Sequence, residues 1–149
     1  MRIRILYLLF FILIFCNCNG QQVEKTEAGN TKEHTFQMVS VPSVITEPEE
    51  RAAYLVKHYW DKFDFTDTTL IHFPEITEQA TSNYIDMMKY VPAKVAASSI
   101  KEMMSKASTD SSMFVYFSGL YEKYLYDPNS PMRDESLYIY LSSTYKCNF

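Results

Sequence analysis

Acidic residues and one histidine gather in a short stretch of the chain, and residues of these types could bind a cation. Asp61, Asp64 and Asp67 recur at every third position, and His72 and Glu75 follow them. Calcium loops use a closer ligand spacing with a glycine at the sharp turn, and this stretch contains no glycine. Zinc requires three or four protein ligands in most sites, so His72 with Glu75 is an incomplete set. We therefore expect no metal ion and no metal cofactor here.

The same stretch is better explained as a connector between two helices. Side chains such as those of Asp64, Thr66 and Asp67 typically form hydrogen bonds with free backbone groups at turns and helix ends. Apolar residues alternate with these polar ones and should pin the connector to the core. They are Phe63, Phe65, Leu70, Ile71 and Phe73.

Residue patterns that support catalysis are scarce in the rest of the chain. No G-x-S-x-G motif is present, and three glycines in the whole chain leave no glycine-rich phosphate loop. Cys147 stands near the end of the sequence without a C-x-x-C partner. We predict no catalytic residue, no cofactor and no enzyme activity.

The first residues are typical of an export signal. Arg2 and Arg4 precede an unbroken apolar run over residues 5–15. As a helix this run would span roughly 16 Å, less than the ~30 Å hydrocarbon layer of a membrane. A signal peptide over residues 1–17 is therefore predicted, and an uncleaved membrane anchor remains the alternative.

Two cysteines at the end of the apolar run indicate a lipid anchor. A cysteine in this position is typical of bacterial lipoproteins, in which acyl chains on the new N-terminal cysteine hold the protein on the membrane. We predict Cys18 as the acylated residue because a polar segment begins directly after it. Cys16 is the alternative anchor, and ordinary cleavage near Gly20 is a further one. The expected location is the bacterial cell envelope, either the periplasm or the outer membrane.

The charge of the chain limits its partners. The formal net charge is −4, and it becomes more negative once the two arginines of the signal are removed. An acidic protein is a poor ligand for nucleic acid and for anionic lipid surfaces. We therefore expect no nucleic-acid partner, and contact with the membrane through the lipid anchor alone.

Hydrophobic periodicity predicts an all-α fold after a tether. Residues 18–45 are expected to form a polar tether and an extended segment, and residues 46–149 a helical domain. Thr46 and Glu49 have the spacing of a capping box at the start of the first helix, and Pro92 should end one helix and open the next. Four clear helical patterns and a fifth, tyrosine-rich segment predict a small bundle or array of four to five antiparallel helices.

Three segments of the helical region resemble a known family. They read "YWDKFDFTDT", "HFPEITEQA" and "EKYLYDPNSPMR", and the resemblance covers residues 46–139. The chain is similar to the uncharacterised helical domain that precedes a thioredoxin-like domain in exported, usually lipid-anchored, proteins of Bacteroides-type bacteria. In that family the redox chemistry belongs to the thioredoxin-like domain, so the resemblance implies no catalytic residue for this chain.

Two functions are compatible with this resemblance. The first is a lipid-anchored, non-catalytic docking module that binds a thioredoxin-like or another envelope protein. The second is a truncated, non-functional remnant of a thiol-disulfide oxidoreductase lipoprotein, because the sequence stops at "YLSSTYKCNF", where the thioredoxin-like part would follow.

Overall fold

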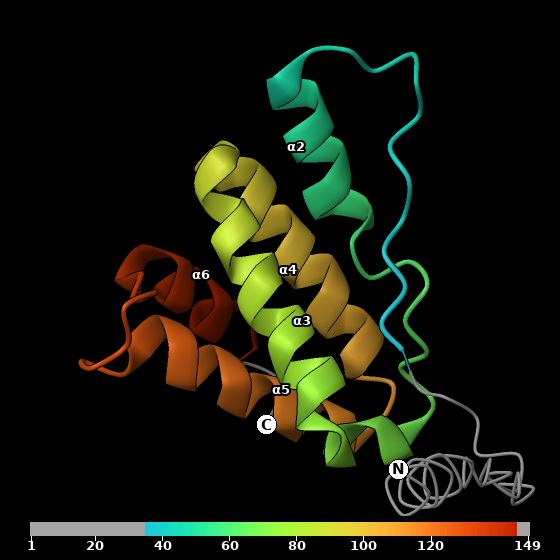
Figure 1. Cartoon of the computed structure of the whole chain (residues 1–149). Coiled ribbons are helices and arrows are strands. Elements are labelled where there is room, and N and C mark those ends of the chain that lie inside the picture. The colour runs from blue at the N-terminus through green and yellow to red at the C-terminus, as the bar shows by residue number, and fades with distance from the viewer. Residues whose placement is uncertain (1–34, 146–149) are drawn as a thin grey trace, which may run out of the picture. The chain divides into compact units, whose positions relative to one another are not determined.

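The computed structural model describes residues 35–145, which contain five α-helices and no β-strand (Figure 1). The predicted all-α fold class is confirmed. The helices are α2 (Pro48–His58), α3 (Pro74–Met87), α4 (Ala93–Ala107), α5 (Ser111–Tyr121) and α6 (Glu135–Tyr145). Two short 3-10 helices, η1 (Thr68–His72) and η2 (Met88–Tyr90), and a π-helical turn, η3 (Glu122–Tyr126), complete the list for this range. The signal, the predicted anchors Cys16 and Cys18, and Cys147 lie outside the described residues.

Prolines and one aspartate set most of the helix starts. Pro48 and Pro74 occupy the first turns of α2 and α3, where a missing N–H costs nothing. Asp110 caps α5 by accepting hydrogen bonds from the backbone N–H groups of Ser112 and Met113, at 2.8 and 3.0 Å. Pro92 precedes α4 directly, as predicted.

The predicted capping box at the start of α2 is wrong. The cap position is held by Glu47, and no side chain caps this helix. Thr46 lies one residue too early, because the helix begins at Pro48, whose fixed φ angle already suits a first helical residue.

The tyrosine-rich last segment is a helix. Leu137 and Leu141 are four residues apart and both are buried, so α6 presents one apolar stripe to the core. Asp134 accepts a hydrogen bond from the backbone N–H of Leu137 at 3.0 Å, which satisfies a free donor of the first turn.

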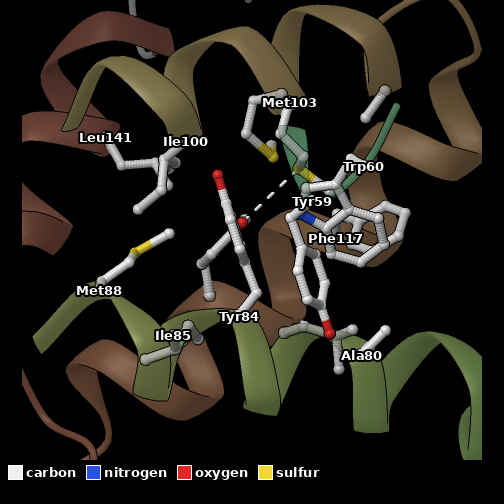
Figure 2. Packing of buried hydrophobic residues seen from close by; sticks show 14 of the residues in the cluster. Tyr59, Trp60, Ala80, Tyr84, Ile85, Met88, Ile100, Met103, Phe117 and Leu141 are labelled. Carbon is white, nitrogen blue, oxygen red and sulfur yellow. Dashed lines mark hydrogen bonds between the residues drawn. The ribbon is translucent and has the colours of Figure 1, made fainter. Parts of the chain in front are cut away.

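Helix α4 lies at the centre of the bundle and contacts α2, α5 and α6. Helices α3 and α4 run in opposite directions in Figure 1. The core between the helices is rich in tyrosine and methionine, as the helical spacing of these residues predicts. Figure 2 shows Tyr59, Tyr84 and Met103 packed among aliphatic and aromatic side chains, and each is at most 2% exposed. All five helices contribute buried side chains to this cluster, so the described part of the chain has a hydrophobic core.

Candidate functional site

Asp64 and Asp67 of the connector after α2 form hydrogen bonds with the threonines two positions after them. Asp64 accepts hydrogen bonds from the backbone N–H and the hydroxyl of Thr66, at 2.9 and 2.6 Å. Asp67 accepts the equivalent pair from Thr69, at 3.2 and 2.5 Å. These are the turn and cap bonds that the sequence predicts. The connector reading of this stretch is therefore confirmed for both aspartates.

Apolar side chains hold the connector against the core, also as predicted. Phe65 and Leu70 are only 6% and 8% exposed, and the remaining three pins are partly buried. The rings of Phe63 and Phe65 pack against Trp60, with ring centroids 5.2 and 5.9 Å from that of the indole. In residues 35–145 no three His, Cys, Asp or Glu side chains come close enough together to hold a metal ion. His72 and Glu75, the pair weighed as zinc ligands, are both exposed.

A polar cluster that the sequence does not reveal joins the end of α2 to α4. Asp61 lies 2.7 Å from Nδ1 of His58 and accepts a hydrogen bond from Lys106 at 3.2 Å. Lys106 also pairs with Glu102 at 3.2 Å. Burial acts to raise the pKa of Asp61, but the bonds from His58 and Lys106 outweigh it and lower that pKa. The cluster fastens two helices together. Both members of the His–Asp pair remain about a third exposed.

A second polar cluster joins α3 to the π turn. Glu78 accepts a hydrogen bond from the hydroxyl of Tyr124 at 2.8 Å and a short one from the ammonium group of Lys123. These two donors, Lys123 first, lower the pKa of the Glu78 carboxyl. The π turn brings two consecutive side chains to one carboxylate.

A groove of about 640 Å³ lies between η2, the first turns of α4, and the segment that leads into α6. Its apolar walls come from five elements and include Ile85, Met88, Ala97, Leu125 and Leu137. Ile85 and Met88 lie on the same side of the core as Leu141 of α6 (Figure 2). A hollow with walls of this kind can bind an apolar body.

Charged residues stand at the rim of this groove. Lys89, Lys94 and Arg133 line it together with a single acid, Asp134. Lys89 pairs with Asp86 at 2.6 Å, and Arg133 pairs with Glu135. Lys94 forms no ion pair with any residue of the described part. Asp86 and Glu135 thus offset two of the three rim cations, and Lys94 is the rim cation that has no ion pair within the described part.

The outer side of α6 is apolar as well as the inner side. We call Tyr126, Tyr138, Ile139 and Tyr140 the α6 face. Ile139 is 62% exposed, and Tyr126 stacks on Tyr138 with ring centroids 4.8 Å apart. Exposed apolar side chains that gather on one part of a surface often mark a contact site. The α6 face therefore has the character of a contact surface.

The match to a protein family covers nearly all of the chain. The family is described as "Domain of unknown function (DUF5106)", and residues 16–147 match it. The chain belongs to the DUF5106 family. The DUF5106 match extends beyond both ends of residues 46–139, the range of the resemblance seen in the sequence. Helix α6 therefore lies wholly inside the DUF5106 domain.

A solved structure with the same fold comes from a thioredoxin-like protein of Bacteroides caccae. This DUF5106 chain is 46% identical to it, with a TM-score of 0.71 over 74% of this chain. The chain spans only 40% of the length of that protein. No curated protein matches the chain. The comparisons thus link this DUF5106 domain to a protein of thioredoxin-like type.

The described residues of the DUF5106 domain offer a groove and an exposed apolar face as surfaces for binding. The polar turn residues and the apolar residues that the sequence predicts for the connector all have the structural role expected of them. The groove and the two polar clusters were not predicted, because each joins residues from distant parts of the chain. No helix in residues 35–145 has both the length and the apolar character needed to cross a membrane.

Proposed function

We propose that this DUF5106 chain is a non-catalytic docking module for a thioredoxin-like domain. The observation that carries the proposal is its 46% identity to part of the Bacteroides caccae thioredoxin-like protein, of whose length it spans 40%. When a helical domain and a thioredoxin-like domain belong to one protein, the two domains share a contact surface or lie near each other. A separate chain with the same fold can use the equivalent surface to bind such a domain as a partner.

The α6 face is the surface that we assign to this contact. Docking would bury Ile139 and the stacked pair of Tyr126 and Tyr138, which water now touches. Tyrosine is enriched at the centres of protein interfaces because its ring is apolar and its hydroxyl can still form a hydrogen bond. The rest of the proposal is that the module is exported and held on the envelope membrane by acyl chains on Cys18, with Cys16 as the alternative. The apolar run over residues 5–15 that leads directly into "CNCNG" supports this location.

The test is a binding titration. The partner is the part of the Bacteroides caccae protein that this chain does not match, and calorimetry follows its binding to residues 34–149. Ile139→Asp should weaken binding about tenfold or more, because it places a charge in the contact. Val115→Asp is the matched control, since Val115 is 64% exposed on α5 and lies outside the α6 face. Absence of binding by the wild type would reject the docking role and favour the remnant alternative. Equal losses in the two variants would reject the α6 face.

A further inference from the structure

The groove beside the first turn of α4 has the two features that a soluble anion with an apolar tail requires. Its walls are apolar, and its volume of about 640 Å³ lies within the range of small-ligand sites, roughly 300–1,000 Å³. Its rim is basic. We propose that this groove binds the carboxylate of a long-chain fatty acid at Lys94 and encloses part of the acyl tail.

The walls favour a flexible chain over a rigid ring. Met88 and Met132 line the groove from two different elements. Methionine side chains are unbranched and polarizable, and they adapt to ligands of irregular shape. Met132 is also held in place, since the hydroxyl of Ser82 donates a hydrogen bond to its sulfur at 3.7 Å. The tail would lie over Ile85, Leu125 and Leu137, which form the deeper wall.

The position of Lys94 supports an anionic head group. Lys94 stands in the first turn of α4, where the partial positive charge of the helix disfavours a cation. The first turn of α4 contains no acidic residue and no capping side chain that would offset this unfavourable interaction. Lys89 and Arg133, the other two cations of the rim, already pair with Asp86 and Glu135. An anion bound at Lys94 would remove this local conflict at the start of α4.

The chemistry of the groove separates this ligand from others. A small inorganic anion would leave the apolar walls exposed to water, so it would gain nothing from them. At Lys94, a cationic amphiphile would meet a charge of its own sign. A neutral alcohol of equal length could use the walls but would lack the attraction of Lys94. The order of affinity should therefore be fatty carboxylate first, fatty alcohol second, and short carboxylate or cationic amphiphile last.

Calorimetric titration with dodecanoate, below its micelle concentration, tests the proposal on residues 34–149, the compact unit that holds the whole core. Saturable binding is expected. Butyrate and dodecyltrimethylammonium, which lack the tail and the negative charge respectively, should bind about tenfold more weakly or not at all. Comparable binding of dodecyltrimethylammonium would overturn the proposal, because detergent-like adsorption needs no basic rim.

Two variants and one control locate the ligand. Lys94→Glu should weaken dodecanoate binding about tenfold, and it should not harm folding, because an acid suits the first turn of a helix. Ala97→Trp should abolish binding by filling the groove. Lys101→Glu makes the same charge change on the exposed side of α4, outside the groove, and should bind like the wild type.

Unchanged binding in Lys94→Glu, or equal losses in Lys94→Glu and Lys101→Glu, would overturn the assignment. The Ile139→Asp variant used for the docking test should retain dodecanoate binding, so the two proposals can fail separately.

Discussion

The indole of Trp60 stands edge-on to the ring of Phe117, with ring centroids 5.4 Å apart and planes at 80°. This contact ties the end of α2 to the middle of α5. Trp60 also packs against Phe36 of the extended segment and against Tyr84 of α3. Its buried indole N–H has no hydrogen-bond partner within the described residues. As the single tryptophan of the chain, Trp60 reports on the core by its fluorescence.

The buried aromatic side chains of the connector should contribute more to the free energy of unfolding than its aspartates do. Phe65→Ala should lower the free energy of unfolding by about 3–5 kcal/mol, because the ring is 6% exposed and its loss leaves a cavity. Asp67→Ala should cost about 0.5–2 kcal/mol, the usual range for a lost cap. Urea unfolding followed by Trp60 fluorescence measures both values. A larger loss for Asp67→Ala would contradict the connector reading.

Buried tyrosines should limit stability at high pH. Burial raises the pKa of Tyr59 to about 12, against an ordinary value of 10.0, and it raises the pKa of Tyr84 and Tyr121 as well. Unfolded tyrosines lose their protons first, so this contribution to stability is full below pH 10 and falls as the pH rises toward 12. The share of tyrosinate absorbance that comes from these buried tyrosines should therefore rise in a step that coincides with loss of helical circular dichroism. Gradual titration of all tyrosines in a folded protein would contradict this expectation.

The Asp61 cluster should contribute a small, acid-sensitive share of stability. The pKa of Asp61 is lowered, so its contribution is present at neutral pH and is lost as the pH falls below about 4. Asp61→Asn should cost less than about 1 kcal/mol at neutral pH, since the ion pairs are largely exposed. The difference from the wild type should vanish in strong acid. Denaturant midpoints at the two pH values, with Asp86→Asn as an exposed control, provide the measurement.

Gly119 should tolerate a methyl group with a gain in stability. It lies in the last part of α5, and a Cβ atom built on it meets no other atom within 4 Å. Alanine loses less backbone entropy than glycine on folding, so Gly119→Ala should stabilise by about 0.5–1 kcal/mol. A rise in the thermal midpoint is expected. A fall would mean that the π turn after α5 needs the freedom of glycine.

Cys18 should carry the acyl chains if the chain is a lipoprotein. Labelling of cells with a palmitate analogue is expected to mark the protein, and Cys18→Ala should abolish the label. A label that survives Cys18→Ala but not Cys16→Ala would move the anchor to Cys16. A wild-type protein without label would reject lipid anchoring.

Local signals predicted the helices well, and distant contacts could not be predicted. Pro74 and Asp110 mark helix starts because their effect depends on neighbouring residues alone. Thr46 misled because a proline two residues later set the start of the helix instead. The bonds from Lys106 to Asp61 and from Lys123 to Glu78 each bridge 45 sequence positions, and no periodicity records such a meeting. The groove likewise exists only once α4 and the start of α6 are packed together.

The π turn η3 affects how this sequence should be compared with others. Its backbone bond runs from the N–H of Asp127 to the carbonyl of Glu122, so the ring encloses one residue more than an α-helical bond would. A relative that lacks one residue between 122 and 126 could close an ordinary α-turn there without moving α5. In an alignment, a one-residue gap at this point would mark a change in helix type and not a shortened loop, and the neighbours of Glu78 would change with it.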